Sequence, residues 1–361
     1  MIKAWPLIDL NLEGGSAMRT GAFSIATVFL VLGTVAFGQE GDPAQAVRLA
    51  QAASLAEQGG AENLQKSFRI YEQLADDGNA EAMNETGNCY FTGIGATKDL
   101  KKAFQWFGRG ASAGSTEAMS NLGDCYRDGE GVAKNTAKAV EWYEKAANAG
   151  EPIAMNNLGF CYEKGTGVSQ NWAKAVEWYE KAADAGEPFA MNNLGECYYQ
   201  GTGVLKDYPK AVEWYEKAAN AGESGAMINL GSCYLNGDGV PRNPAKAVDW
   251  FQKAANAGDP LAMCNLGLCF ANGTGVRSNR RVAMKWLEKS AGAGYAPARE
   301  AINEINLRGI EAVGNLLRAL AGSSGSASRP GISEQADRER QERRARFYTI
   351  QPNRGGVGYR P

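Results

Sequence analysis

One spacing constrains this chain more than any other feature, because three kinds of residue each recur every 36 positions. They are methionine (Met83, Met119, Met155, Met191, Met227, Met263), cysteine (Cys89, Cys125, Cys161, Cys197, Cys233, Cys269) and tryptophan (Trp106, Trp142, Trp178, Trp214, Trp250, Trp286). Six copies without an insertion or deletion indicate one structural unit stacked six times, since a change of length would break the contact between neighbouring units.

Each unit has the pattern of two helices. In residues 151–186, Ala154 and Leu158 begin one apolar helical stripe, and Ala175 and Tyr179 begin a second. Six polar residues share the position where the second helix should begin, and each can accept a hydrogen bond from a free backbone N–H there: Asp99, Asn135, Asn171, Asp207, Asn243 and Asn279. We expect antiparallel pairs of roughly 13 and 15 residues. One pair cannot cover its own apolar faces, so the pairs must stack.

The detailed motif resembles a known family. Leu158-Gly159-x-x-Tyr162, followed by Ala175-x-x-x-Tyr179, resembles the tetratricopeptide signature. The period of 36 and the added turn Gly165-Thr166-Gly167-Val168 are similar to those of the Sel-one-like repeat family of the tetratricopeptide-like superfamily. The resemblance covers residues 78 to about 294. It implies an all-α fold, a right-handed α-α superhelix (solenoid) with capped ends, used mainly as a scaffold or adaptor for other proteins.

The pattern divides the chain into segments. Residues 79–294 hold the six tandem repeats, and residues 39–78 hold a divergent copy in which Ile70 and Tyr71 fall at the Trp-Tyr positions. That copy lacks the Met, Cys and Leu-Gly elements, so we interpret it as an N-terminal capping repeat. We expect residues 295–321 to form a C-terminal capping helix, because a bare terminal repeat would expose core surface.

The start of the chain is typical of an exported protein. Residues 18–38 combine one arginine, an apolar run of about 17 residues and the small residues Ala36 and Gly38, which is the pattern of a signal peptide. We interpret residues 1–17 as a misassigned start, and expect cleavage before Gln39 and export from a bacterial cell, to the periplasm or the medium. After processing no membrane span would remain. The alternative is an uncleaved N-terminal helix that anchors the protein, although the run is short for a span.

Seven cysteines in an exported chain raise the question of disulfides. Equivalent positions in stacked repeats lie about one helix diameter, or 10 Å, apart. A disulfide needs Cα atoms within about 7 Å. Cys264 and Cys269 are five residues apart on one helix and point to different faces. We therefore interpret the six periodic thiols as small apolar core residues, in preference to a redox or metal role.

Signals of catalysis are weak. The chain has no histidine, which excludes Ser-His-Asp and Cys-His nucleophiles and histidine-ligated zinc. The Gly-x-Gly turns at residues 165–167 and 201–203 lack the Gly-Lys-Ser/Thr of a phosphate loop. We expect no catalytic residue, no cofactor and no metal site. Four acid–base pairs at i,i+4 spacing should form exposed ion pairs: Glu141–Lys145, Glu177–Lys181, Glu213–Lys217 and Asp249–Lys253.

The candidate binding residues lie on the first helices, which line the concave face of tetratricopeptide-like solenoids. One row holds five asparagines: Asn121, Asn157, Asn193, Asn229 and Asn265. By the resemblance, these amides would offer donors and acceptors to a bound peptide backbone. Alternatively, each asparagine bonds a neighbouring loop and holds the repeat spacing. Neighbouring rows vary between copies, and in them Phe160, Ile228 and Leu268 are candidate partner contacts if they are exposed.

The C-terminal segment differs in composition. After a Gly/Ser-rich stretch from residue 322, residues 329–361 carry eight arginines against four acids, a local charge of +4 on a chain of −2. This predicts either a solvated disordered tail or an arm for an anionic partner such as acidic lipid, nucleic acid or cell-wall polymer. The overall charge gives no drive toward specific nucleic-acid recognition.

The favoured function is a noncatalytic exported scaffold that binds a protein or peptide in its concave groove. A cell-envelope hydrolase or a binder of wall fragments is the alternative from another class, and it would need a pocket with converging carboxylates, which the sequence does not reveal. A purely structural spacer is the third, and for it the variable rows would have no use.

Overall fold

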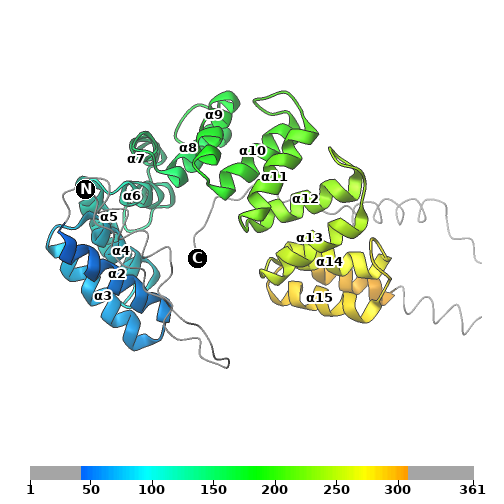
Figure 1. The fold of residues 1–361 in the computed structure, drawn as a ribbon, viewed down its shortest axis with the longest axis horizontal. Helices are drawn as coiled ribbons and strands as arrows, with labels where there is room; N and C mark the ends of the chain where they lie inside the picture. Colours follow the sequence, from blue (N-terminus) through cyan, green and yellow to red (C-terminus); the bar gives the residue numbers. More distant parts are fainter. Residues whose placement is uncertain (1–41, 308–361) are drawn as a thin grey trace, which may run out of the picture. The chain divides into compact units, whose positions relative to one another are not determined.

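The computed structural model describes residues 42–307, and all regular structure in that range is helical (Figure 1). The chain divides into two units at residues 118 and 119, and each unit is described here by itself. Residues 1–41 and 308–361, which include the predicted signal peptide and the basic tail, lie outside the described residues.

The first unit contains two long helices followed by the first regular pair. Its helices are α2 (Pro43–Gln58), α3 (Ala61–Asp76), α4 (Ala80–Thr92), α5 (Leu100–Ser112) and the first residues of α6 (Thr116–Asp128). Each helix from α2 to α4 packs against the next along the chain. Leu74, Ala75, Ala82 and Met83 form the buried core there. The helices α2 and α3 have 16 residues each, against 13 in each helix from α4 to α15.

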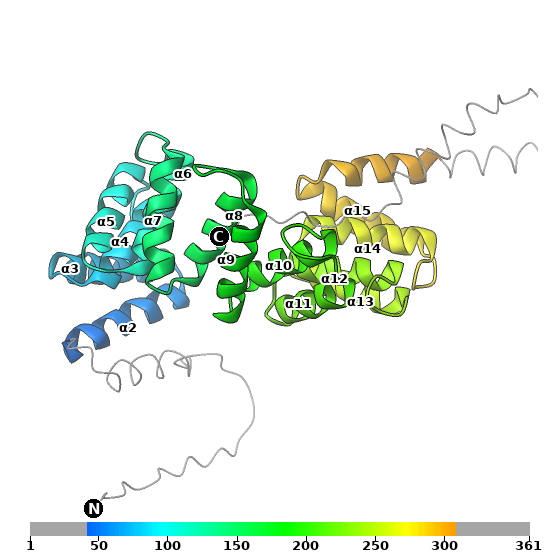
Figure 2. The same ribbon diagram turned by 90° about the horizontal axis from the view of Figure 1, so that it is seen from above.

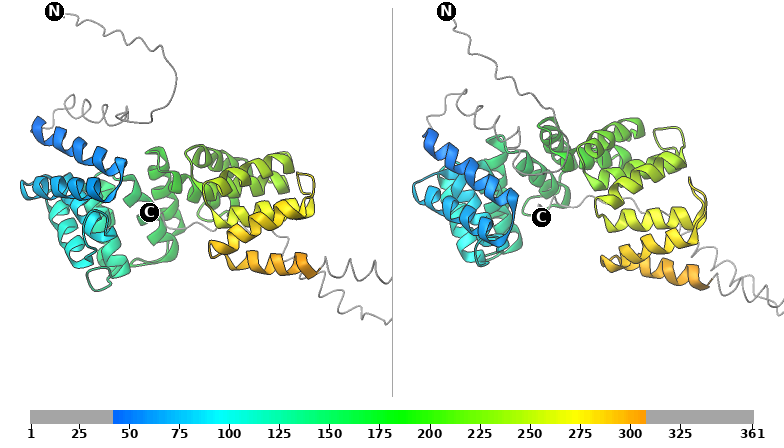
Figure 3. Two further views of the ribbon diagram at one scale, coloured as in Figure 1. Left: turned by 90° about the horizontal axis from the view of Figure 1, so that it is seen from below. Right: turned by 60° about the horizontal axis from the view of Figure 1, so that its bottom comes forward.

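The second unit repeats one helix pair with little variation. After the rest of α6 come α7 (Thr136–Asn148), α8 (Pro152–Lys164), α9 (Trp172–Asp184), α10 (Pro188–Gln200), α11 (Tyr208–Asn220), α12 (Ser224–Asn236), α13 (Pro244–Asn256), α14 (Pro260–Asn272) and α15 (Arg280–Gly292). From α7 onward each helix packs against the next, both within a pair and between pairs, and the turned views show the same neighbours (Figures 2 and 3). The order is that of an all-α repeat superhelix.

The predicted helix starts are confirmed, and the second helices are shorter than expected. Each of the six Asp or Asn residues accepts a hydrogen bond from a backbone N–H in the first turn of its helix. At the other end, the N–H of Ala185 bonds the carbonyls of Lys181 and Ala183, which closes α9 after 13 residues. The loop between the helices fits tightly: at Gly203, φ is +76° and a Cβ would lie 2.5 Å from the carbonyl oxygen of Trp172.

Aromatic rings and small residues fill the second unit. Tyr143, Tyr179, Tyr215 and Phe251 are fully buried, and the cysteine row from Cys125 onward is buried beside them. All seven thiols are free, so the prediction of core cysteines without disulfides is confirmed. Burial is the main cause that raises their pKa values to about 11 or 12, and Cys89 alone is half-buried.

The four predicted i,i+4 ion pairs are wrong. None of them is among the ion pairs of residues 42–307. In all five second helices from α7 to α15, the lysine lies over a half-buried tryptophan ring three residues earlier, with Nζ 3.7 to 4.6 Å from the ring centroid. The indole face attracts the ammonium group and covers its aliphatic stem, which an exposed carboxylate cannot do.

A further helix over residues 296–307 follows α15. Its Ala298 and Ala301 are buried against Cys264 and Leu287, the last core residues of the repeats. Between residues 42 and 307 no helix is long and apolar enough to cross a membrane. The same residues contain no cluster of three or more Cys, Asp or Glu side chains placed to hold a metal ion.

Candidate partner-binding face

The predicted asparagine row lies mostly in the interior. Asn157, Asn193, Asn229 and Asn265 are buried, and Asn121 is half-buried. Two of the amides join successive first helices: Asn193 Nδ2 donates to Asn156 Oδ1 over 2.9 Å, and Asn229 Nδ2 donates to Asn192 Oδ1 over 3.0 Å. These bonds connect repeats, through a neighbouring helix and not through a loop.

The asparagine-to-asparagine bonds end where the acceptor position no longer holds an asparagine. The residue that should accept from Asn265 is Ile228, which is apolar and 0 % exposed. The Nδ2 group of Asn265 is therefore buried without a hydrogen-bond partner among the described residues. A buried amide without a partner is costly, and the bonds that join α8 to α10 and α10 to α12 have no counterpart from α12 to α14.

The three apolar candidates have different surroundings. Ile228 was a candidate partner contact only if it was exposed. It is buried in the core, so it cannot contact a partner. Leu268 packs against the helix over residues 296–307. Phe160 is half-buried on α8, and Lys164 Nζ lies 5.5 Å from its ring centroid. Of these three side chains, Phe160 is the one that remains available on the surface of the first helices.

A second polar pattern, which the sequence reading missed, runs through the same helices. Three buried tyrosines of the second helices each donate their hydroxyl to a carboxylate on the first helix of the same pair: Tyr143 to Asp124 (2.6 Å), Tyr179 to Glu163 (2.8 Å) and Tyr215 to Glu196 (2.9 Å). Burial, and then the adjacent carboxylate, raises the pKa of each tyrosine well above its usual value. The hydroxyls therefore keep their protons and act as fixed donors.

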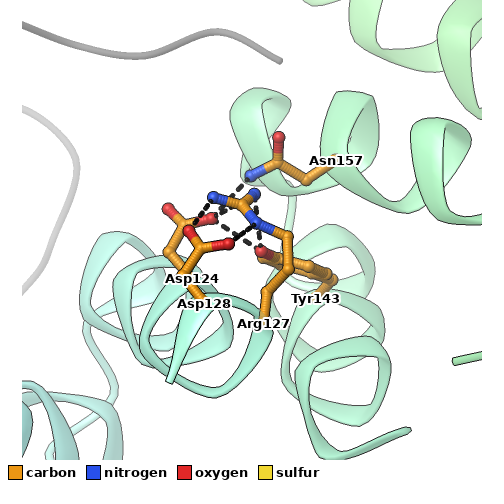
Figure 4. Close-up of polar contacts among 5 residues, drawn as sticks. All are labelled: Asp124, Arg127, Asp128, Tyr143 and Asn157. Atoms are coloured by element: carbon orange, nitrogen blue, oxygen red, sulfur yellow. Dashed lines mark hydrogen bonds and ion pairs between the residues drawn. The ribbon is translucent and has the colours of Figure 1, made fainter. Parts of the chain in front are cut away.

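The pair on α6 belongs to a larger cluster (Figure 4). Arg127 lies between Asp124 and Asp128, with a nitrogen 2.7 Å from an oxygen of each, and it also donates to the hydroxyl of Tyr143 over 3.0 Å. From α8, Asn157 Nδ2 approaches Asp124 Oδ1 at 3.4 Å. Arg127 contacts both aspartates, so the charged groups of this cluster are paired with one another and its net charge is −1.

Among residues 42–307, pairs of this kind, from a second helix to the first helix of the same repeat, occur only in the three repeats from α6 to α11. Other tyrosine–carboxylate bonds, such as Tyr90–Glu72 and Tyr234–Glu216, join a first helix to the second helix of the preceding repeat. At the tyrosine position the other repeats have Phe107, Phe251 and Leu287, which are as deeply buried, and the divergent copy has Tyr71, which is buried but makes no hydrogen bond to a carboxylate among the described residues. The matching first helices α4, α12 and α14 have no carboxylate at either position that pairs with a tyrosine in the central repeats. Those positions hold Asn88, Phe91, Ser232, Leu235, Leu268 and Ala271. The joint occurrence of the tyrosine and a first-helix carboxylate in three consecutive repeats was the signal in the sequence that could have revealed this pattern.

Two of the three carboxylates share a pocket of about 410 Å³ between α8 and α10. Its lining residues come from both helices, the start of α9 and the following loop: Glu163, Lys164, Trp172, Asn193, Glu196, Cys197, Gln200 and Thr202. The converging carboxylates that the sequence did not reveal are thus present. Each carboxylate oxygen accepts a hydrogen bond or ion pair, from Tyr179 and Lys164 on Glu163 and from Tyr215 and Gln200 on Glu196.

The first unit has a larger surface pocket, of about 1010 Å³, between α3 and the loop that joins α4 to α5. Its charged residues give a net charge of +1, with Arg69, Lys98 and Lys102 against Glu72 and Asp99. The Tyr90 ring forms part of the wall, and its hydroxyl donates to Glu72 over 3.1 Å. The residues that line this pocket precede the repeats with the tyrosine–carboxylate pairs of α6 to α11.

Comparison with known proteins identifies the repeat. The family model for the Sel1 repeat matches seven consecutive segments: 48–79, 80–115, 116–151, 152–187, 188–223, 224–259 and 260–295. The chain belongs to the Sel1 repeat family. The first matched segment covers part of α2 and all of α3, which the sequence reading treated as a divergent capping copy. Sel1 repeats generally mediate protein interactions, and this Sel1-repeat chain has that scaffold fold.

Two solved structures are similar to this Sel1-repeat protein. One is c5321, a protective antigen of uropathogenic Escherichia coli strains with an SLR fold, at 38 % identity and a TM-score of 0.58, covering 67 % of this chain and 52 % of that one. The other is a Sel1 repeat protein from Oxalobacter formigenes, at 30 % identity and a TM-score of 0.60, covering 67 % of this chain and 96 % of that one. The aligned part is thus about half of the E. coli antigen. No curated protein sequence matches the chain significantly.

Proposed function

We propose that this Sel1-repeat protein is a noncatalytic, exported scaffold that binds a protein or peptide on the first helices of its central repeats, α6 to α11. The confinement of the tyrosine–carboxylate pairs to these repeats carries the proposal. Phe107 and Phe251 fill the same position at 2 % and 0 % exposure, so packing alone does not require a hydroxyl. What the hydroxyl adds is a fixed surface carboxylate, and fixed polar groups lower the entropic cost of recognition.

The pocket between α8 and α10 favours binding over hydrolysis. A hydrolase that uses two carboxyl groups needs one of them protonated, so that it can donate to the leaving group. Here all four oxygens of Glu163 and Glu196 act as acceptors. The nearby thiol of Cys197 is also unsuited to nucleophilic attack, because burial raises its pKa to about 12.

The asparagines that the sequence predicted as partner contacts would have a supporting role. Asn157, Asn193 and Asn229 would support the binding face from beneath by fixing the spacing of the first helices. Phe160 would supply an apolar contact beside the pocket. A spacer without partners would have no use for surface features restricted to three of its repeats, which supports the binding role over the structural one.

Selection of peptides from a display library against the full-length protein tests the binding function. We expect saturable binding of selected peptides, measured by fluorescence anisotropy. Tyr179→Phe and Tyr215→Phe together should weaken it about fivefold or more, because each carboxylate loses its ordering donor. The control is Tyr234→Phe, whose hydroxyl contacts Glu216 at 3.3 Å and lines no described pocket. Absence of saturable binding, or equal affinity in the wild-type protein and both variants, would overturn the proposal.

Export rests on the composition of residues 18–38 and has its own test. The protein recovered from the periplasm or the medium of the producing bacterium should begin at Gln39 when sequenced from its N-terminus. A mature chain that still carries residues 18–38 would favour the anchored alternative, and one that carries residues 1–17 would remove the proposed start at Met18.

A further inference from the structure

The pocket between α8 and α10 has a surplus of hydrogen-bond acceptors. Two of its donor side chains are engaged, since Lys164 contacts Glu163 Oε1 at 2.5 Å and Gln200 donates to Glu196 Oε1 over 2.9 Å, while the Trp172 indole N–H and the Thr202 hydroxyl also line the pocket. A carboxylate oxygen has two lone pairs, so each of these oxygens can accept one bond more. Two carboxylates against one lysine leave the pocket with a net charge of −1.

The amide oxygen of Asn193 is a further acceptor on the wall of the pocket. Asn193 is 6 % exposed and lines the pocket, and its Nδ2 is engaged with Asn156. Within residues 42–307 no group donates to its Oδ1. A ligand with several N–H donors and one positive charge would therefore match the acceptors and the charge of the pocket.

The guanidinium group of arginine meets these demands. It is planar, carries five N–H donors and forms paired bonds with carboxylates. It also stacks on aromatic faces, and the half-buried indole of Trp172 forms one wall of the pocket. An ammonium group has three donors around one point and gains less from two carboxylates and an amide on different sides.

The C-terminal segment of the same chain is rich in arginine. Residues 329–361 contain eight arginines and a net charge of +4, whereas residues 42–307 carry −6. Residues 308–328 join the two and span at most about 70 Å when fully extended. Neighbouring packed helices are about 10 Å apart, so the three repeat steps from α10 to the helix over residues 296–307 amount to about 30 Å. The segment can therefore reach the pocket.

We infer that the pocket formed by Glu163, Asn193 and Glu196 binds arginine side chains, and that its occupant in the free protein is the chain's own segment 329–361. This inference rests on the proposed binding function and names the regulation of that site. A covalently joined segment competes at an effective concentration on the order of millimolar. A partner must then displace it, so removal of its charges should tighten the binding of partners.

Photo-cross-linking in the full-length chain tests the inference. Benzoylphenylalanine replaces Gln200, an exposed residue of the pocket, and the product is digested and read by mass spectrometry. We expect cross-links from position 200 to residues 329–361 within single chains. The matched control is position 236 on α12, which is the same place in the next repeat but has Ser232 where α10 has Glu196. It should give background labelling only.

Two charge variants complete the design, each checked for unchanged helical content by circular dichroism. Glu163→Gln with Glu196→Gln, and separately Arg343→Gln, Arg344→Gln and Arg346→Gln together, should each reduce the cross-link at position 200 at least fivefold. Equal capture at positions 200 and 236, capture that survives both variants, cross-links only between chains, or no capture of the segment would each overturn the inference. If display-selected peptides still bind in a Tyr179- and Tyr215-dependent manner, the proposed function stands without it.

Discussion

At the scale of single residues, the asparagine row offers a comparison between equivalent positions. Asn193→Ala removes the donor to Asn156 and leaves a buried carbonyl oxygen unpaired, which should lower the free energy of unfolding by about 1–3 kcal/mol. Asn265→Ala removes an amide whose Nδ2 has no partner among the described residues, and should cost clearly less. Both changes delete the same atoms from buried sites, so cavity effects largely cancel in the comparison.

Urea denaturation followed by circular dichroism measures both variants under one condition. If the two losses are equal, the bond between α8 and α10 contributes nothing and the row is only packing. A larger loss at Asn265 would reverse the interpretation altogether.

The thiols give a second prediction at this scale. An ordinary cysteine, with a pKa near 8.5, is about one quarter thiolate at pH 8. A pKa of about 12, as for Cys197 and Cys233, leaves about one thiolate in ten thousand. We expect iodoacetamide at pH 8 to leave the six buried cysteines unmodified in the folded protein, and to modify all seven in urea. Rapid native labelling of several thiols, read by intact mass, would show that the core is open.

At the scale of helices, the close contact between the two members of a pair depends on one glycine. A Cβ at Gly195 would lie 2.7 Å from two ring carbons of Tyr215 and 3.2 Å from the carbonyl oxygen of Ala211. Gly195→Ala should therefore destabilise the protein by about 1–3 kcal/mol, through displacement of α10 from α11. The displaced ring would also carry its hydroxyl away from Glu196.

The matched control is Gly108→Ala, also inside a helix, where an added Cβ meets no atom within 4 Å. Alanine favours the helix over glycine by about 1 kcal/mol, so this variant should be neutral or more stable. Thermal unfolding of both variants decides the matter. Parallel destabilisation would mean that the helix backbone itself, and not the contact with Tyr215, rejects alanine.

The helices also show where reading the sequence succeeds and where it stops. Caps and apolar periodicity are local, so the starts at Asn171 and its equivalents and the buried cysteines were predictable. Partner choice is not local: Lys181 has both Glu177 and Trp178 within one turn, and only the packed structure shows that it covers the ring. Likewise, the burial of Ile228 and the bond from Tyr179 to Glu163 depend on how neighbouring helices pack.

At the scale of the whole molecule, stability in a repeat protein is a sum of local terms, because each repeat contacts only its neighbours. The last repeat therefore depends on the helix over residues 296–307, whose Ala298 is fully buried beside Leu287. Ala298→Asp places a charge in that contact without touching any other repeat. The expected result is local: α14 and α15 should open more often, while α8 to α11 keep their stability.

Hydrogen exchange with mass spectrometry separates these outcomes. In Ala298→Asp the amides of α14 and α15 should exchange faster by tenfold or more, and those of α8 to α11 should be unchanged. Ala293→Asp serves as a control, because Ala293 is exposed at the end of α15 and its change adds the same charge near the same repeat. Faster exchange along all of α7 to α15 in the first variant would mean that the repeats unfold as one unit. The central binding face would then depend on the cap, and could not be treated as an independent part of the molecule.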